Sequence, residues 1–314
     1  MNTRPLLPKL LAAVSGLLLA CALHAETWRF AVIGDTPYND HEVAQLPRLL
    51  DQIAAQHPAF IVHAGDFKDS RMVCSDQTFR ARRDLLDASP LPLIYVPGDN
   101  EWTDCRQLVA GNFDPLERLQ KLRELFFAEP RSLGRSRLSV EQQPGSHPEH
   151  LRWQLGPLLF VSLNVPGPNN NYGMENTPSD EFLVRNRSVV DWLRQAFARA
   201  RHGQLAGVVI VMQANPSFKH HAAGLTHAGF RELLDTLTAE TIAFPGQVLL
   251  IHGDTHWQRI DQPLRHPTTR QPLTNFTRLE TFGYPFMGWV KVIVDDQQPQ
   301  LFRFEVHPYP ANRP

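Results

Sequence analysis

Short apolar runs of strand length recur along this chain, and segments of helical character separate them. The runs are rich in Val, Ile and Leu, do not alternate with polar residues, and are mostly bounded by Gly, Pro or Asp. Runs of this kind are typical of strands that are buried on both faces, as in a parallel sheet. We therefore expect strands at 28–33, 59–63, 92–96, 158–163, 207–212 and 247–251.

The segments between these runs have the spacing of amphipathic helices. In the first of them, Val43, Leu46, Leu50 and Ile53 recur at roughly helical intervals. Alternation of strand and helix favours an α/β fold with a largely parallel sheet covered by helices. The helices are expected at 42–56, 77–88, 115–127, 182–201 and 227–240.

The last third of the chain has a different pattern. Apolar runs at 277–282, 289–294 and 301–306 follow one another without a helix between them, which predicts an antiparallel meander and a second, strand-rich layer. We find no repeat, no coiled-coil heptads and no low-complexity linker. With 42% hydrophobic residues, the chain is expected to form one globular domain over residues 26–314.

Four Gly-Asp dipeptides stand directly after predicted strands. They place Asp35, Asp66, Asp99 and Asp254 at the ends of four strands. In open α/β sheets the ligand crevice lies at the carboxyl ends of the strands, so these carboxylates are expected to converge. Converging carboxylates repel one another unless a cation lies between them. The pattern therefore predicts a metal site.

The last of these loops adds an imidazole. Asp254 and His256 are two residues apart, so an extended loop would direct both side chains the same way. Carboxylate and imidazole ligands together suit divalent transition ions. Two ions that share one carboxylate can bind the attacking and leaving oxygens of a phosphoryl transfer.

These blocks, from about Phe30 to Asp261, resemble the calcineurin-like metallophosphoesterases in order, spacing and strand context. That family has Asp-x-His, Gly-Asp, Gly-Asn-His-Asp/Glu, a lone histidine after a strand, and Gly-His-x-His. The resemblance implies a four-layer α/β/β/α sandwich of two mixed sheets and hydrolysis of phosphate mono- or diesters by a metal-activated water at a dinuclear centre. Asp35 matches the first aspartate, Asp66 the aspartate that bridges two ions, and His256 the last histidine. Asp99 occupies the position of the family asparagine, and Asp254 occupies the position of a family histidine.

The departures from the family make the predicted site rich in oxygen. Pro37 replaces the first histidine, and Tyr38 beside it is a candidate ligand or substrate contact. Asn100 occupies the position of the histidine that protonates the leaving group. After 208–212 the chain offers the amides of Gln213 and Asn215 as ligands instead of a histidine. Such a set predicts two divalent ions, Mn, Fe, Mg or Ca rather than Zn.

Three further residues are candidates for the site. Glu101 follows Asn100 directly and is expected to orient a ligand, with a surface carboxylate as the alternative. Arg106 is expected to contact the phosphate, with a solvated arginine as the alternative. Asn164 ends a predicted strand and opens the loop 166–171, which is expected to edge a pocket and contact the substrate.

The N-terminus predicts export. Arg4 and Lys9 precede an uncharged stretch at 10–23, and Ala25 precedes Glu26, as in a signal peptide over residues 1–25. The alternative is a lipoprotein acylated at Cys21. Removal of residues 1–25 would leave 29 Lys and Arg against 32 Asp and Glu, a formal charge of −3. This balance indicates neither a nucleic-acid patch nor a basic surface for acidic membranes, and no segment predicts a transmembrane helix.

Cys74 and Cys105 would then be the two cysteines of the exported chain. An even pair in an exported protein indicates a disulfide, with two buried thiols as the alternative. They follow Asp66 and Asp99 by eight and six residues, so neighbouring loops at one metal site would bring them together.

Three functional hypotheses remain. The first is an exported, periplasmic or secreted metal-dependent phosphoesterase. The second is a catalytically impaired relative that keeps the fold and binds a ligand. The third is an esterase with Thr36 of Gly34-Asp35-Thr36 as nucleophile, although it leaves Asp66, Asp99 and Asp254 unexplained.

Overall fold

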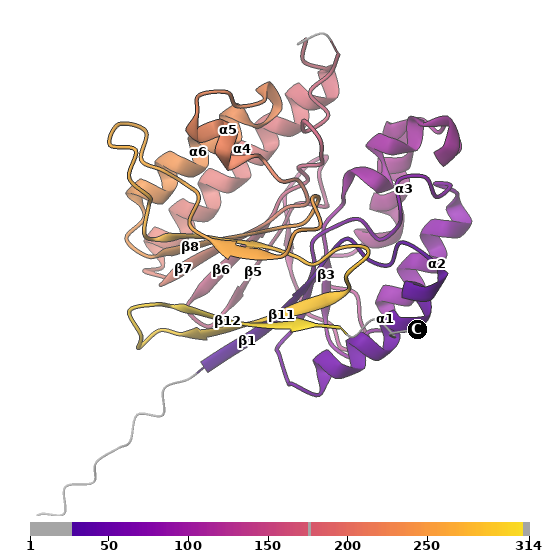
Figure 1. Ribbon diagram of the computed structural model, residues 1–314, viewed down its shortest axis with the longest axis horizontal. Coiled ribbons are helices and arrows are strands. Elements are labelled where there is room, and N and C mark those ends of the chain that lie inside the picture. Colours follow the sequence, from indigo (N-terminus) through magenta and orange to yellow (C-terminus); the bar gives the residue numbers. More distant parts are fainter. Residues whose placement is uncertain (1–26, 175–176, 310–314) are drawn as a thin grey trace, which may run out of the picture.

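The computed structural model describes residues 27–174 and 177–309. Two mixed β-sheets pack face to face, with one set of helices outside each (Figure 1). The predicted signal peptide and Cys21 fall outside the described residues. Among the described residues, no helix has both the length and the apolar character needed to cross a membrane.

The first sheet has five strands in the order β12-β11-β1-β2-β3. The strands β1 (Thr27–Ile33), β2 (Ile61–His63) and β3 (Leu93–Tyr95) are parallel, as the apolar runs predict. Strand β11 (Gly288–Asp295) pairs antiparallel with both β1 and β12 (Phe302–Pro308). All three parallel strands therefore end at the same edge.

The second sheet has seven strands in the order β4-β5-β6-β7-β8-β10-β9. Its central strands β6, β7, β8 and β10 are parallel, and the outer strands are antiparallel. The bounds are β4 (Glu141–Gln142), β5 (Leu151–Leu155), β6 (Leu158–Ser162), β7 (Gly207–Val211), β8 (Gln247–His252), β9 (Arg259–Asp261) and β10 (Phe276–Glu280).

The predicted three-stranded meander is wrong. Strand β10 pairs parallel with β8, in register from Phe276 with Val248 to Glu280 with His252, and joins the second sheet. Only β11 and β12 form the predicted antiparallel pair. An apolar run shows that a strand is buried, but its partner is decided by contacts far apart in the sequence.

Four of the helices begin with a side-chain cap. The side chains of Asn39, Ser75, Asp114 and Ser179 accept hydrogen bonds from the first turns of α1, α2, α3 and α4. The bounds are α1 (Asp40–Ala54), α2 (Asp76–Asp87), α3 (Pro115–Phe126), α4 (Asp180–His202), α5 (Phe218–Ala222) and α6 (Ala228–Ala243).

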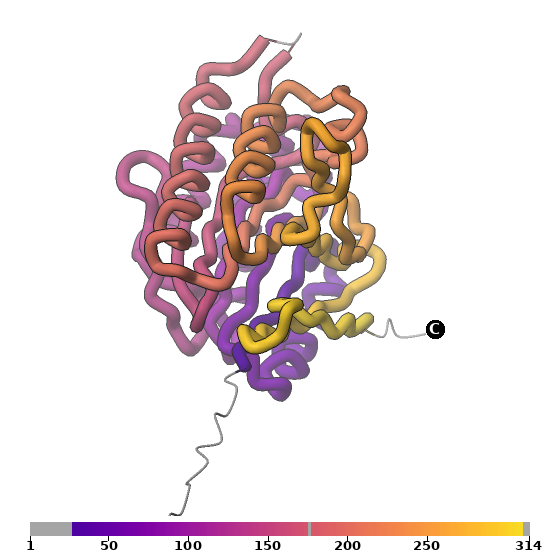
Figure 2. Tube along the Cα trace, turned by 90° about the vertical axis from the view of Figure 1, so that its left-hand side faces the viewer, coloured from indigo at the N-terminus to yellow at the C-terminus, as the bar shows by residue number. Residues whose placement is uncertain are grey.

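Two hydrophobic clusters separate the layers. The larger fills the space between the sheets and under α1, α2 and α3, with Phe30, Phe60 and Phe160 packed at its centre. The second lies between the outer face of the second sheet and the helices α4 and α6, which run side by side (Figure 2). The chain is thus an α/β protein of two mixed sheets, as expected.

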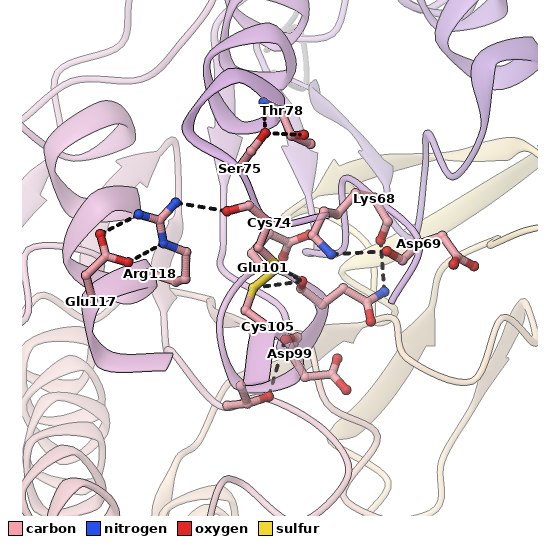
Figure 3. The surroundings of a disulfide bond; sticks show 12 residues. Lys68, Asp69, Cys74, Ser75, Thr78, Asp99, Glu101, Cys105, Glu117 and Arg118 are labelled. Carbon is pink, nitrogen blue, oxygen red and sulfur yellow. Dashed lines mark hydrogen bonds and ion pairs between the residues drawn. A yellow bond between two sulfur atoms is a disulfide. The ribbon is translucent and has the colours of Figure 1, made fainter. Parts of the chain in front are cut away.

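Cys74 and Cys105 form a disulfide, with Cα atoms 5.7 Å apart. The bond joins the loop after β2 to the loop after β3 and lies beside Asp99 and Glu101 (Figure 3). The predicted pairing is confirmed, and the alternative of two buried thiols is wrong. A disulfide is typical of proteins in oxidising compartments.

Candidate metal centre

The four aspartates of the Gly-Asp dipeptides come together where strands of the two sheets end. Asp35, Asp66 and Asp99 follow β1, β2 and β3 of the first sheet, and Asp254 follows β8 of the second. Asp35, Asp66 and Asp254 have φ angles of 50°, 59° and 81°. This left-handed conformation is unfavourable for non-glycine residues and concentrates at functional sites.

Glycines allow these carboxylates to approach other loops. A Cβ atom on Gly253 would lie 2.2 Å from Asp35 Oδ2, and one on Gly98 would lie 2.0 Å from Asp66 Oδ1. A larger residue at either position would displace a carboxylate. The absence of a side chain at Gly98 and Gly253 therefore makes room for Asp66 and Asp35.

Asp35 is held by two donors from later parts of the chain. The backbone N–H of Asp254 donates to Asp35 Oδ1 at 2.9 Å, and the Thr281 hydroxyl donates to Asp35 Oδ2 at 3.0 Å. His256 Nε2 lies 3.6 Å from Asp35 Oδ1. The first and last Gly-Asp loops are thereby in direct contact.

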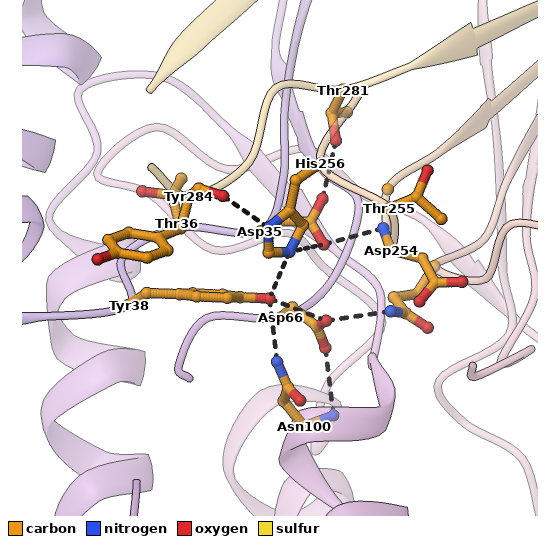
Figure 4. Close-up of polar contacts among 12 residues, drawn as sticks. Asp35, Thr36, Tyr38, Asp66, Asn100, Asp254, Thr255, His256, Thr281 and Tyr284 are labelled. Atoms are coloured by element: carbon orange, nitrogen blue, oxygen red, sulfur yellow. Dashed lines mark hydrogen bonds and ion pairs between the residues drawn. The ribbon is translucent and has the colours of Figure 1, made fainter. Parts of the chain in front are cut away.

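Asp66 lies at the middle of the cluster (Figure 4). Its Oδ2 accepts from the Tyr38 hydroxyl and from Gln213 Nε2, each at 3.1 Å. Its Oδ1 accepts from the backbone N–H of Asn100 at 3.2 Å. The Tyr38 hydroxyl also lies 3.1 Å from His256 Nε2 and accepts from Asn100 Nδ2 at 3.0 Å.

Gln213 connects Asp66 to Asp99. Its Nε2 donates to Asp99 Oδ1 at 2.8 Å as well as to Asp66, while its Oε1 accepts from the backbone N–H of Gly167 at 2.8 Å. Because a backbone N–H can only donate, the N–H of Gly167 binds Oε1 of Gln213 and so turns Nε2 towards the carboxylates. Asn215 contributes its backbone N–H, which donates to Asp254 Oδ2 at 2.8 Å.

The cluster has an excess of buried negative charge. Burial raises the pKa of all four aspartates, and the neighbouring carboxylates raise it further. The pKa of Asp99 rises to about 8 and that of Asp254 to about 6. Among the described residues no lysine or arginine forms an ion pair with them, since buried Lys68 donates instead to the carbonyl of Asp69. A bound cation would remove this repulsion.

His256 has the orientation of a metal ligand. Its Nδ1 lies 2.7 Å from the carbonyl oxygen of Tyr284, which can only accept, so the proton of the neutral ring is on Nδ1. The lone pair of Nε2 then faces Tyr38 and Asp35. Metal-binding histidines commonly donate their other N–H to a carbonyl in this way.

The carboxylates and the imidazole of the cluster suit divalent cations, but hydrogen-bond donors of other side chains lie between them. Within the described parts of the chain, no three or more His, Cys, Asp and Glu side chains are grouped closely enough to hold an ion as they stand. Gln213 Nε2 lies between Asp66 and Asp99, and the Tyr38 hydroxyl lies between Asp66 and His256. Binding of an ion would require these two side chains to shift.

Two of the predicted residues do not reach the cluster, and a third supports it through the backbone. Glu101 is fully buried, so the alternative of a surface carboxylate is wrong, and it accepts from the backbone N–H groups of Asp66, Phe67 and Gly98 at 2.6–3.1 Å, which orients the loops that carry Asp66 and Asp99. Arg106 is exposed. Asn164 is buried and donates to Glu149 at 3.1 Å.

The structure adds residues that the sequence patterns did not indicate. Thr281 and Tyr284 belong to the segment after β10 and contact Asp35 and His256, while Gly167 orients Gln213. Thr281 stands directly after β10. If β10 had been assigned to the second sheet beside β8, the position of Thr281 at a strand end would have made it a candidate. Thr36, the alternative nucleophile, is buried and donates its hydroxyl to Glu42 at 3.0 Å.

Comparisons with known proteins agree with this architecture. The family model for calcineurin-like phosphoesterases matches residues 29–258. The structure of PhoD aligns with a TM-score of 0.53 at 12% identity, over 89% of this chain and 68% of that one. Purple acid phosphatase PPD1 from yellow lupin (Lupinus luteus) seeds aligns with a TM-score of 0.52 at 11% identity, over 90% and 54%.

A dimetal phosphatase from Danio rerio aligns over 90% of this chain and 99% of that one, with a TM-score of 0.49 and 13% identity. No protein of curated function has a significantly similar sequence. At these identities the structural matches above 0.5 show a shared fold.

Proposed function

Because this chain belongs to the calcineurin-like phosphoesterase family, we propose that it hydrolyses phosphate mono- or diesters at a metal centre built on its four Gly-Asp loops. One observation carries the proposal. Three buried aspartates and the half-buried Asp254 converge without a lysine or arginine ion-pair partner among the described residues, and their mutual repulsion favours a multivalent cation.

Two divalent ions would share Asp66. Asp35, Asp66 and His256 are suited to hold the first, and Asp66, Asp99 and Asp254 the second. Gln213 and Asn215 would supply oxygens to the second ion only after reorientation, because the Gln213 amide now donates to carboxylates and Asn215 Oδ1 accepts from the backbone N–H of Ser217. Four carboxylates and one imidazole favour Mn, Fe, Mg or Ca over Zn.

The chain's own residues would act on the substrate through hydrogen bonds. When bound, the ions would activate water and polarise the phosphoryl group. Tyr38 presents a hydroxyl beside Asp66, from which a phosphoryl oxygen could accept once a bound ion takes its place on the carboxylate. The Asn100 amide donates to the Tyr38 hydroxyl and to the carbonyl of Lys68, and so orients Tyr38. Neither is a strong acid at neutral pH, and burial and the nearby carboxylates raise the pKa of Tyr38 further. The centre should therefore prefer esters whose leaving group needs no proton.

Metal analysis together with hydrolysis assays tests the proposal. Purified protein should retain divalent metal, hydrolyse aryl phosphate mono- or diesters, lose activity with a chelator and regain it with Mn²⁺, Fe²⁺, Mg²⁺ or Ca²⁺. Activity that chelators leave unchanged would contradict it.

A second candidate is a relative that binds ligands without turnover. One support is Asn100, which occupies the position of the family's histidine. The other is that the Tyr38 hydroxyl and the Gln213 amide already donate hydrogen bonds to carboxylates of the cluster. Metal retention without hydrolysis of any phosphoester would favour this candidate.

Export is part of the proposal. The N-terminal pattern and the disulfide between Cys74 and Cys105 together support an oxidising compartment, either periplasmic or extracellular. Acylation at Cys21 remains the alternative route.

A further inference from the structure

An aromatic cavity of about 290 Å³ lies between the first turns of α1 and the segment 282–287, which follows β10. Four aromatic side chains line it, and Met287 adds a polarisable thioether. The rings are those of Phe282, Tyr284, Phe286 and Tyr309. Phe286 is 69% exposed, so an aromatic face remains available at the entrance.

The cavity has one carboxylate in its wall. Glu42 is buried, and its Oε2 accepts from the backbone N–H of Tyr38 at 2.8 Å and from the Thr36 hydroxyl at 3.0 Å. Its Oε1 has no hydrogen-bond or ion-pair partner among the described residues. No lysine or arginine lines the cavity in the part of the chain that the structure describes, and His41 is the only other ionisable side chain apart from the tyrosines.

The cavity adjoins the metal centre through Tyr284. The backbone N–H of Tyr284 donates to the carbonyl of Asp35 at 3.3 Å, and its carbonyl accepts from His256. Its ring stacks on Tyr38 with centroids 6.0 Å apart, and its hydroxyl points away from the carboxylates (Figure 4). One residue therefore contacts two candidate metal ligands and also lines the cavity.

Glu42 also has a structural role, since it lies in the first turn of α1 and receives a hydrogen bond from Tyr38. That role occupies only Oε2. A cavity for a neutral apolar group would not need a carboxylate oxygen without a partner in its wall. Aromatic faces together with a carboxylate are suited to a cation that carries apolar substituents, such as an alkylammonium group.

We propose that this cavity binds the alkylammonium group of the substrate, and that the hydrolysed phosphoester is an ester of a cationic amino alcohol such as choline. The proposal rests on the proposed function for its hydrolytic step. Recognition of the ammonium group does not depend on it, so binding can be tested without turnover.

The first experiment measures binding by calorimetry or NMR titration. The probes are choline and its neutral isostere 3,3-dimethylbutan-1-ol, which has the same shape without the charge. Choline should bind about tenfold more tightly, as expected for a cation at several aromatic faces and a carboxylate. Equal affinities would show a neutral apolar site and would overturn the proposal.

Two variants locate the binding. Glu42→Gln keeps an acceptor for Tyr38 and should reduce the preference for choline to about twofold or less, because the charge attraction is lost. Phe286→Ala should weaken choline binding several-fold. The matched controls are Glu129→Gln and Ile242→Ala, which alter an exposed carboxylate and an exposed apolar side chain outside the cavity and should leave binding unchanged. Unchanged binding in both cavity variants would overturn the assignment.

A kinetic comparison separates this proposal from the proposed function. Metal-loaded protein should hydrolyse the choline ester of phenyl phosphate with a higher kcat/KM than the 3,3-dimethylbutyl ester, mainly through KM, and Glu42→Gln should remove the difference. Hydrolysis of both esters at the same kcat/KM would overturn the substrate assignment while supporting the proposed function. Selective choline binding with no hydrolysis of any phosphoester would overturn the proposed function and leave only the binding site.

Discussion

The side-chain amide of Gln213 donates to Asp99 Oδ1 at 2.8 Å and thereby joins the end of β7 in one sheet to the end of β3 in the other. The same nitrogen donates to Asp66. In the absence of an ion, this amide is the donor that separates two buried carboxylates. Its replacement should therefore affect both stability and metal binding.

We expect Gln213→Leu to lower the free energy of unfolding of the metal-free protein by about 1–3 kcal/mol, because two buried acceptors lose their donor. Gln213→Glu should be less stable still without metal, since it adds a carboxylate to the cluster, but saturating Mn²⁺ should restore its stability. Urea unfolding with and without the ion measures both effects. A Gln213→Glu protein as stable as wild type without metal would contradict this role.

Asp66 is expected to serve both ions. Asp66→Asn should lose most of the bound metal and the activity, whereas Asp35→Asn and His256→Ala should mainly affect one ion. Mass-spectrometric metal analysis after dialysis measures the occupancy. Asp261→Asn, which alters an aspartate paired with Arg278 outside the cluster, is the matched control. Full metal occupancy in the Asp66→Asn protein would refute the proposal that Asp66 binds both ions.

The disulfide should stabilise the fold and the centre together. It closes a ring over residues 74–105, and a ring of this size contributes roughly 3–4 kcal/mol in the chain-entropy model. Cys74→Ser should therefore lower the melting temperature, and it should also lower metal affinity because the bond joins the loops after Asp66 and Asp99. Thiol counting on denatured, oxidised protein should find neither Cys74 nor Cys105 reactive, and two reactive thiols would contradict the pairing.

Acid should destabilise the protein through a buried histidine away from the metal centre. Burial lowers the pKa of His150 from 6.5 to about 3, and its Nδ1 lies 2.6 Å from Gln143 Oε1. The unfolded chain takes up a proton below about pH 6.5 and the folded chain does not. The stability that the neutral ring provides is therefore complete above pH 6.5 and is lost as the pH falls towards 3.

The slope from this one group approaches 1.4 kcal/mol per pH unit within that range. His150→Gln should flatten the decline measured by urea unfolding between pH 6.5 and 4.5. His63 and His252, whose pKa values burial also lowers, should preserve part of the decline. An unchanged slope in the His150→Gln protein would contradict this origin.

Export predicts a defined mature terminus. Protein isolated from the source cells should begin at Glu26, or at an acylated Cys21 if the lipoprotein alternative holds. N-terminal sequencing and intact-mass measurement distinguish the two. Protein that begins at Met1 would exclude both.

The sequence by itself determined the elements that depend on local pattern. Each of the six apolar runs is a strand, and each of the five predicted amphipathic segments is a helix. A strand buried on both faces is a continuous apolar run, and a helix buried on one face has apolar residues at helical spacing, so both can be read locally. The Gly-Asp dipeptides also predicted that Asp35, Asp66, Asp99 and Asp254 meet at strand ends. The first three share one edge of the first sheet, and the packing of the two sheets brings Asp254 to them.

Tertiary structure alone decided the relationships between segments far apart in the chain. Strand β10 joined β8 rather than β11, and only that pairing brought Thr281 to Asp35 and Tyr284 to His256. The orientation of the Gln213 amide depends on a single N–H of Gly167, 46 residues away. Local periodicity records which face of a segment is buried, whereas a hydrogen-bond partner across the fold depends on how the two sheets pack.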